Sequence, residues 1–279
     1  LTWGNVSGID RERGLVVIKP SGLPYDTMQP EDICLLQLDG SAVEGVTNPY
    51  KPSSELPMHC AVYKMRPDLR AVLHAHPPAL VSFSTVRQAP NLDLVSSVRK
   101  ICPEVKIAVY AVPGSDELGD NIGKCFAAGC DIVLLENHGV CIGARDMFTA
   151  FQRFETLDYT ANLEILANRV GKLRTLEQEA WEIARIDLID EDLLAKDRTK
   201  GIVHIYISSF HSSEELAARR DMITLIRRSY RQGLFTATHG TYSVRLSDGS
   251  FLITPFGMDR AYLEEDDLVR VKAGMKEQG

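Results

Sequence analysis

The alternation of short apolar runs with helical segments over residues 1 to 150 constrains the fold more than any other feature of this chain. Four runs have the length of buried strands and are bounded by Pro, Gly or Asp. They are residues 16–18, 71–73, 107–110 and 132–135. Strands that alternate with helices indicate a layered α/β domain.

Helix signals lie between these runs. We expect one helix to begin around Ser53, to carry Pro57 in its first turn and to continue through Met65. Ser115 is the expected N-cap of a helix that stops near residue 129. Asp146 is expected to cap a long amphipathic helix that contributes to the core or to a subunit contact. The apolar face of that helix comprises Phe151, Phe154, Leu157, Ala161 and Ile165.

The last part of the chain echoes its opening. Residues 168–213 form a charged connector that includes a strand-like run at 202–207. Three segments then resemble earlier ones in the same order. Residues 238–243 echo 2–7, residues 252–257 echo 17–22, and residues 266–268 echo 31–33. A helical segment from about Glu214 to Gln232 precedes the second copy and has no counterpart before the first.

We therefore divide the chain into a first domain with its connector, residues 1–213, and the opening elements of a second repeat, residues 214–279. A helix and a few strands without a sheet of their own cannot bury an apolar face. The second segment is accordingly expected to pack on the first domain or on a partner chain. The chain begins with Leu1 and enters a motif at once, so we expect it to be a fragment of a longer protein.

Composition narrows the possible partners. The formal net charge of −7 leaves no broad basic surface for nucleic-acid phosphates, so nucleic acid is not an expected partner. The apolar runs are far shorter than the roughly 20 residues of a membrane helix, so neither is a membrane. The six cysteines lack the paired spacing of a thiolate metal site and read as reduced, mostly buried thiols. These features predict a cytoplasmic protein.

Three histidines predict a metal site. His74 and His76 follow the apolar run 71–73, and their spacing places both imidazoles on one face of a strand. Such a pair taken alone is more often structural. His138 follows another buried run, and Gly139 permits a tight turn that would direct its ring into a cleft. Three imidazoles with one free coordination position are typical of a catalytic zinc.

Polar turns close to these histidines could hold a phosphate group. Ser53 and Ser54 open a helix, where unpaired N–H groups attract anions, and Glu55 follows them. Asn5 and the turn Ser21-Gly22 add polar groups and a flexible backbone. Two structural alternatives remain open: Ser53 could be only an N-cap, and Ser21-Gly22 only a turn. Lys19 has no assigned role.

The combination of motifs resembles the class II aldolase/adducin family, which includes fuculose-phosphate and rhamnulose-phosphate aldolases and ribulose-phosphate 4-epimerase. The resemblance covers most of residues 1–170. It rests on the order of the motifs Gly-Asn-Val-Ser (4–7), Lys-Pro-Ser-Gly (19–22), Pro-Ser-Ser-Glu (52–55), His-Ala-His (74–76) and Asn-His-Gly (137–139). It implies an α/β fold, a three-layer α/β/α sandwich around a mainly antiparallel sheet, and a homo-oligomer, commonly a tetramer with the active site at a subunit boundary.

The resemblance also implies roles for single residues. The metal ligands, for Zn²⁺ or another divalent metal, fall on His74, His76 and His138. The acid/base carboxylate falls on Glu55. The phosphate-binding groups fall on Asn5, Ser21, Gly22, Ser53 and Ser54. We expect an aldehyde-lyase, a class II aldolase that cleaves a small phosphorylated ketose through a zinc-stabilised enediolate.

Departures from the family keep alternatives open. The aldolases use a tyrosine from a neighbouring subunit, but residues 89–109 contain none; Tyr110 could substitute or could be structural. The epimerases have an aspartate where Glu55 stands, which favours the aldolase over pentulose 5-phosphate 4-epimerisation. A non-catalytic adducin-like module is disfavoured because the metal ligands are present. In the second copy Thr241 replaces the asparagine and Phe256 the serine, so its phosphate site is expected to be degraded.

Two further side chains near the expected site could support it. Glu136 could orient His138 by a hydrogen bond. His59 is read as a packing residue or as a residue that supports the site from behind. The remaining histidines lie outside the matched motifs.

Overall fold

The computed structural model of the chain describes residues 3–177 and 211–271. It divides into two compact units, Leu1–Glu177 and Gln178–Gly279. We call them the first and the second unit. The strand-like run at 202–207 and most of the expected connector, residues 178–210, lie outside the described residues.

The first unit is built on a seven-stranded sheet in the order β3-β2-β1-β4-β7-β6-β5. All neighbouring strands are antiparallel except β5 and β6. The strands are β1 (Asn5–Asp10), β2 (Leu15–Ile18), β3 (Cys34–Gln37), β4 (Ala71–Ala75), β5 (Val105–Ala108), β6 (Ile132–Leu135) and β7 (Gly139–Ala144). The predicted mainly antiparallel sheet is confirmed.

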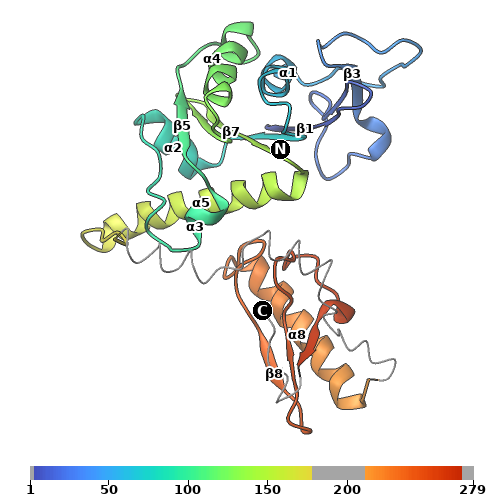
Figure 1. Cartoon of the computed structure of the whole chain (residues 1–279), viewed down its shortest axis with the longest axis vertical. Helices are drawn as coiled ribbons and strands as arrows, with labels where there is room; N and C mark the ends of the chain where they lie inside the picture. Colours follow the sequence, from blue (N-terminus) through green and yellow to red (C-terminus); the bar gives the residue numbers. More distant parts are fainter. Residues whose placement is uncertain (1–2, 178–210, 272–279) are drawn as a thin grey trace. The chain divides into compact units, whose positions relative to one another are not determined.

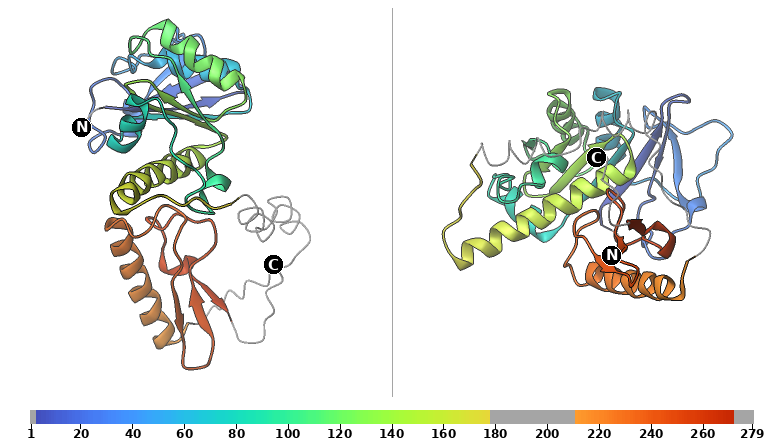
Figure 2. Two further views of the ribbon diagram at one scale, coloured as in Figure 1. Left: turned by 90° about the vertical axis from the view of Figure 1, so that its left-hand side faces the viewer. Right: turned by 60° about the horizontal axis from the view of Figure 1, so that its bottom comes forward.

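Helices cover both faces of this sheet (Figures 1 and 2). On one face lie α1 (Leu56–Met65) and α4 (Asp116–Ala127), and on the other α2 (Pro78–Thr85), α3 (Val98–Ile101) and α5 (Met147–Val170). A short 3-10 helix, η1 (Pro30–Asp32), precedes β3. Each face has its own cluster of buried apolar side chains. The fold is therefore the predicted three-layer α/β/α sandwich.

Two expected helix starts are confirmed and one is wrong. The Ser115 hydroxyl accepts from Leu118 N at 3.2 Å, and the Asp146 carboxylate accepts from Thr149 N at 2.7 Å. The helix expected at Ser53 begins instead at Leu56. Ser53 N donates to Lys19 O at 3.2 Å, so the chain up to residue 53 is still extended and paired with the loop that follows β2.

One expected strand is misplaced by two residues. The run 107–110 was expected to be a strand, but β5 ends at Ala108. Val109 and Tyr110 are 65% and 51% exposed. Their apolar character therefore reflects an exposed surface rather than a buried strand.

Residues 211–271, the described part of the second unit, form one long helix and a small sheet. The helix α8 (Ser213–Arg231) is followed by β8 (Ser243–Arg245), β9 (Phe251–Ile253), the 3-10 helix η2 (Glu265–Asp267) and β10 (Val269–Val271). The strands form an antiparallel sheet in the order β10-β9-β8. Met222 and Ile226 of α8 are buried with Leu252 and Leu263, each at most 1% exposed. The premise that this segment has no sheet of its own is wrong.

The two units share the register of their first three strands. Ser7 pairs with Ile18 as Ser243 pairs with Ile253. Likewise Ile18 pairs with Cys34, and Ile253 with Val269. Both 3-10 helices carry a reciprocal capping box. Three glycines with positive φ also correspond: Gly4 and Gly240 (80° and 86°), Gly14 and Gly249 (67° and 81°), and Gly22 and Gly257 (74° and 68°).

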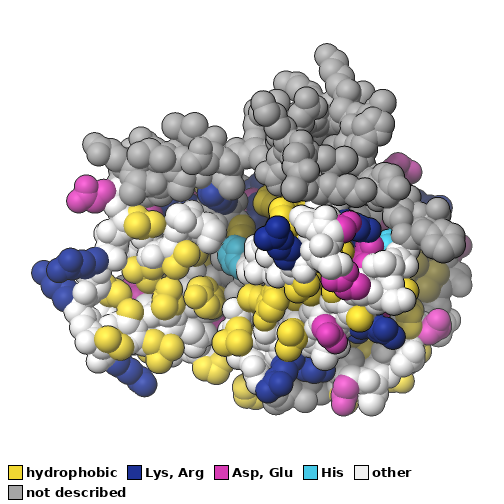
Figure 3. Space-filling model, turned by 90° about the horizontal axis from the view of Figure 1, so that it is seen from below, with side chains coloured by type: hydrophobic (Ala, Val, Ile, Leu, Met, Phe, Trp, Pro, Cys, Tyr) yellow, Lys and Arg dark blue, Asp and Glu magenta, His cyan; other side chains and the backbone are white. Residues whose placement is uncertain are grey.

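The surface agrees with the charge balance of the sequence. On the face shown in Figure 3, basic side chains are dispersed among acidic, apolar and uncharged polar ones. Among the described residues, no helix combines the length and the apolar character that crossing a lipid bilayer requires.

Candidate metal centre and substrate pocket

The three histidines predicted as ligands meet at one end of the sheet. His74 lies in β4 and His76 directly after it, while His138 lies in the turn between β6 and β7, the strand that pairs with β4. Their ring centroids are 4.6 to 4.8 Å apart. The antiparallel pairing of β4 with β7 thus brings together residues separated by more than 60 positions.

A hydrogen bond to the backbone fixes the tautomer of His74. Its Nδ1 lies 2.9 Å from Val140 O, and because a carbonyl can only accept, Nδ1 carries the proton. The other ring nitrogen, Nε2, is therefore the one available to the cluster. It faces His76 Nε2 at 2.7 Å and Glu55 Oε2 at 3.2 Å. A backbone carbonyl that orients a metal-binding imidazole in this way is a common feature of metal sites.

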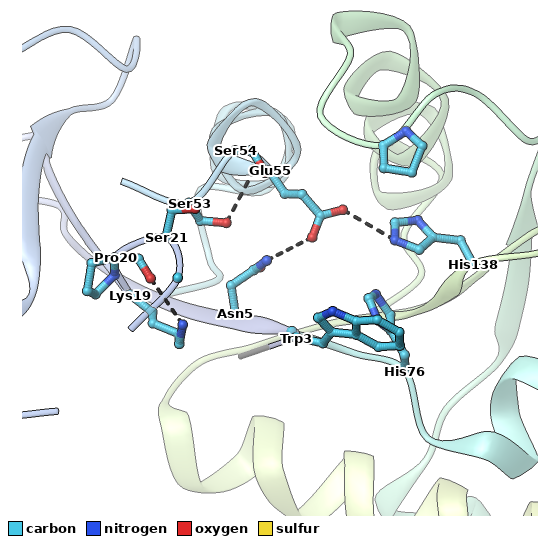
Figure 4. Close-up of a pocket in the computed structure, with 13 residues that line it drawn as sticks. Trp3, Asn5, Lys19, Pro20, Ser21, Ser53, Ser54, Glu55, His76 and His138 are labelled. Atoms are coloured by element: carbon cyan, nitrogen blue, oxygen red, sulfur yellow. Dashed lines mark hydrogen bonds and ion pairs between the residues drawn. The ribbon is translucent and has the colours of Figure 1, made fainter. Parts of the chain in front are cut away.

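Glu55 completes the cluster from the residue before α1. Its Oε2 accepts a hydrogen bond from Asn5 Nδ2 at 2.8 Å, and its Oε1 lies 3.4 Å from His138 Nε2 (Figure 4). The four donor atoms of Glu55 and the three histidines lie within 4.8 Å of one another. Glu55 Oε1 and His138 Nδ1 are buried without a hydrogen-bond partner among the described residues. Three imidazoles and a carboxylate fit a divalent metal such as zinc.

The surroundings favour the protonation states that a metal needs. Burial lowers the pKa of His138 to about 4 and also lowers the pKa of His76, so both rings are neutral at pH 7. Burial alone would raise the pKa of the Glu55 carboxyl. The hydrogen bond and charge of His74, together with the Asn5 amide, outweigh burial and lower that pKa to about 2. Glu55 is therefore ionised and able to accept a proton.

The turn that presents His138 differs from expectation in one respect. Asn137, not Gly139, adopts the left-handed conformation, with φ at 54°. Gly139 is needed for space, because a Cβ there would lie 2.5 Å from Ala75 O and from His76 Cδ2. The glycine thus allows β7 to approach the end of β4 that carries His74 and Ala75.

The predicted phosphate-binding residues line the same cavity as the metal cluster. The cavity has a volume of about 360 Å³. Its walls include all five of them, Asn5, Ser21, Gly22, Ser53 and Ser54, together with Glu55, His76 and His138. Figure 4 shows Ser21 and Ser53 on the side opposite His76 and His138. This size suits a small molecule that reaches from one group to the other.

Three residues that the sequence analysis left without a role also line this cavity: Trp3, Lys19 and Pro113. Lys19 is only 2% exposed, and its ammonium donates to Pro20 O at 3.0 Å and lies 4.7 Å from the centre of the Tyr25 ring. A buried lysine beside a polar turn is a further anion-binding group. In the sequence, this role could have been inferred from the position of Lys19 directly before the polar turn Pro-Ser-Gly.

The structure decides some of the alternatives. Ser53 is not the N-cap of α1, because Glu55 occupies that position and no side chain caps the helix. Glu136 does not bind His138; it accepts from Arg87 Nε at 3.0 Å and from Tyr110 N at 3.2 Å. His59 is fully buried and hydrogen-bonded to Asn5 and Ser7. It belongs to the support of the site rather than to the apolar core alone.

A family model described as "Class II Aldolase and Adducin N-terminal domain" matches residues 1–165 and 220–278. The 5-deoxy-D-ribulose 1-phosphate aldolase of Bacillus thuringiensis serovar kurstaki is 36% identical over 184 residues, which are 65% of this chain and 83% of that protein. The L-ribulose-5-phosphate 4-epimerase of Salmonella paratyphi B is 55% identical over 75 residues, only 27% of this chain and 32% of that enzyme. A solved L-fuculose 1-phosphate aldolase superposes with a TM-score of 0.58 and 33% identity, covering 65% of this chain and 84% of that one.

Proposed function

The chain belongs to the class II aldolase and adducin family, and from this premise we propose that it is a metal-dependent aldolase that cleaves a small phosphorylated ketose. One observation carries the proposal. Glu55, His76 and His138 of the histidine cluster line a cavity whose opposite side presents hydroxyl and backbone groups suited to a phosphate. A substrate that spans the cavity places its carbonyl end near the cluster.

His74, His76 and His138 would hold the divalent metal, for which zinc is the proposed identity. The bound metal supplies Lewis-acid polarisation of the substrate carbonyl. The chain's own contribution is geometric and electrostatic. It keeps His76 and His138 neutral and holds all three rings close together, so little reorganisation is needed when a metal binds.

Glu55 is the proposed acid/base. Its carboxylate is ionised and lies at the cavity wall, where it can take a proton from the carbon next to the carbonyl or return one. When substrate excludes water from the cavity, the burial that already opposes ionisation grows, and the pKa of Glu55 rises toward the range of an effective base.

The phosphate is proposed to bind among Asn5, Ser21, Gly22, Ser53 and Ser54. Hydroxyls and the open backbone at Gly22, whose φ is 74°, can donate several hydrogen bonds to an anion. The Lys19 ammonium adds positive charge at the same wall. These groups orient the substrate rather than perform chemistry.

A second candidate is 4-epimerisation of a pentulose 5-phosphate. It is favoured by the 55% identity to the Salmonella epimerase over 75 residues. The aldolase remains the preferred function because the longer Glu55 side chain stands where the epimerases have aspartate, and because the aldolase match extends over 184 residues.

The test is to measure the metal content of the purified protein and then to incubate it with ketose 1-phosphates and with pentulose 5-phosphates. We expect release of a triose phosphate and an aldehyde from a ketose 1-phosphate, measured with a coupled dehydrogenase. Interconversion of pentulose 5-phosphates without any triose phosphate would reject the aldolase and support the epimerase. Turnover of neither class by metal-loaded protein would reject both and favour an adducin-like module.

We also propose that residues 214–279 are the opening elements of a second aldolase-like repeat. The shared strand register, the paired capping boxes and the family match over residues 220–278 support this assignment.

A cytoplasmic homo-oligomer is the proposed state of the enzyme. The exposed side chains of Val109 and Val112, close in sequence to the cavity residue Pro113, support a subunit contact there.

A further inference from the structure

A row of hydrogen-bonded side chains runs from the interior of the first unit to Glu55. Tyr63 OH lies 2.8 Å from Ser7 Oγ, which lies 2.6 Å from His59 Nδ1. His59 Nε2 makes a short contact with Asn5 Oδ1, and Asn5 Nδ2 lies 2.8 Å from Glu55 Oε2. Each of these five residues is at most 8% exposed. None of the three side chains behind Asn5 lines the substrate cavity.

The direction of every hydrogen bond in this row follows from elementary chemistry. The ionised Glu55 carboxylate can only accept, so Asn5 Nδ2 faces it and Asn5 Oδ1 faces His59. That oxygen can only accept, so His59 Nε2 carries a proton and donates it. Burial, with the nearby charge of His74, lowers the pKa of His59 to about 3, so the ring is neutral and its Nδ1 has no proton. Ser7 therefore donates to His59 Nδ1, which leaves Tyr63 as the donor to Ser7.

The row depends on two regular elements facing each other. Asn5 and Ser7 are two residues apart on β1 and share one face of the strand. His59 and Tyr63 are four residues apart on α1 and share one face of the helix. Neither pair can turn away from the other without breaking the packing of α1 on the sheet.

We infer that His59 is a positioning residue that fixes the orientation of the Asn5 side-chain amide. The catalytic consequence of this inference rests on the proposed function. An asparagine amide can turn over and exchange its oxygen with its nitrogen. With His59 donating to Oδ1, the Asn5 nitrogen must face Glu55.

The orientation matters at both ends of the amide. If it turned over, Asn5 Oδ1 would face the Glu55 carboxylate, and two acceptors would oppose each other with no proton between them. In the fixed orientation one N–H of Asn5 is bonded to Glu55, and the second is free to donate into the cavity that Asn5 lines. His59 thus sets both the position of the base and the direction of one substrate contact.

The first experiment needs no substrate. Nitrogen NMR of imidazole-labelled protein should show His59 as the neutral Nε2–H tautomer throughout the range from pH 5.5 to 8. In Asn5→Ala the ring loses its acceptor, and the Nε2 proton should exchange faster with solvent. The Nδ1–H tautomer, or a His59 signal that does not respond to Asn5→Ala, would overturn the inference whatever the enzyme catalyses.

The second experiment is a double-mutant cycle on kcat and KM with the ketose phosphate that the wild type cleaves. His59→Phe keeps an aromatic ring at this position but removes both hydrogen bonds of the imidazole. We expect kcat/KM to fall roughly 10- to 100-fold with unchanged metal content. In the Asn5→Ala background the same change should cost less than about threefold, because its effect acts through Asn5. Additive losses would reject the inference.

The matched control is Val62→Ala, which removes fully buried volume from the same helix but none of the hydrogen bonds of the row. It should lower the melting temperature but leave kcat/KM within about twofold.

If His59→Phe does not fold, Ser7→Ala provides the same cycle, because it removes the donor that occupies His59 Nδ1. A loss in Val62→Ala equal to that in His59→Phe would show a packing effect and contradict the inference. Failure of the wild type to cleave any ketose phosphate would reject the proposed function, and the NMR experiment would still decide the inference.

Discussion

The first three strands of the first unit and the sheet of the second unit have the same order, register and capping box. Within the described residues, only the first unit carries a cluster of side chains that could hold a metal ion. In the first unit β1 pairs with β4 on its other side, and α1 lies over it. Among the described residues of the second unit, β8 is an edge strand. The three-stranded opening is thus a scaffold that holds no site until β4, β7 and α1 are added.

A comparison of single positions shows the same contrast. Asn5 of the first unit donates to Glu55, but Thr241 stands at the corresponding place in the second. Near Gly257, the guanidinium of Arg260 donates to the carbonyls of Gly240, Pro255 and Met258. Three backbone acceptors around this loop are thus bound to a cation of the same unit, an arrangement that the first unit does not share at Gly22 among the hydrogen bonds described above.

The largest expected difference between the two units is in metal binding. We expect close to one divalent metal per chain, and His76→Ala should lose most of it. Removing a ligand should weaken binding by more than the roughly 10- to 100-fold typical of losing a hydrogen-bond partner of a ligand. Elemental analysis after dialysis measures this. His239→Ala in the second unit is the control and should keep the metal; a loss there, or full metal in His76→Ala, would place the site elsewhere.

Glu55→Gln should separate chemistry from metal binding in the first unit. The amide nearly preserves shape but cannot accept a proton, so turnover should fall by roughly 10²- to 10⁴-fold while the metal content stays unchanged. Hydrogen–deuterium exchange at the carbon next to the carbonyl of dihydroxyacetone phosphate is the direct measurement. Exchange at the wild-type rate would exclude Glu55 as the base.

A smaller effect tests the paired glycines. Gly4→Ala and Gly240→Ala both place a side chain at positive φ, which costs about 1 to 3 kcal/mol. At Gly4 the new Cβ would also lie 2.8 Å from His74 O, whereas at Gly240 it would meet the Phe235 ring. Both variants should therefore lose stability in thermal melts, and only Gly4→Ala should also lose metal affinity. Equal loss of metal in both would contradict the separation of scaffold and site.

The smallest expected effect comes from restoring the missing residues in the second unit. The double change Thr241→Asn and Phe256→Ser recreates the matched motif letters. It should add neither metal nor phosphate binding, because no strand corresponding to β4 pairs with β8 in the described residues. Calorimetry with inorganic phosphate, compared with the unchanged chain, provides the measurement. A new phosphate site would show that the strands alone suffice.

Sequence patterns predicted those parts of the site that lie close together along the chain. The spacing of His74 and His76 was sufficient because a strand has a fixed period of two. The caps at Ser115 and Asp146 were local as well. The later start of α1 was not predictable, because it depends on pairing between residues 51–53 and the distant loop after β2.

Other features required the folded chain. The need for Gly139 arises from the approach of β7 to Ala75 and His76, which no local pattern encodes. The hydrogen bonds of His59 join segments more than 50 positions apart in the sequence. The burial of Lys19 likewise arises only when the chain packs. The sequence predicted the candidate groups, whereas tertiary contacts determine which way their side chains point.

The position of β8 at the edge of its sheet also has a bearing on solubility. An edge strand presents unpaired backbone N–H and C=O groups, and any extended chain can add to it as a further strand. Ser243, Val244 and Arg245 are all exposed, and the strand is only three residues long. Its shortness and the charge of Arg245 are the features by which natural sheets resist aggregation through open edges. Arg245→Val would remove that protection and create an apolar edge prone to self-association.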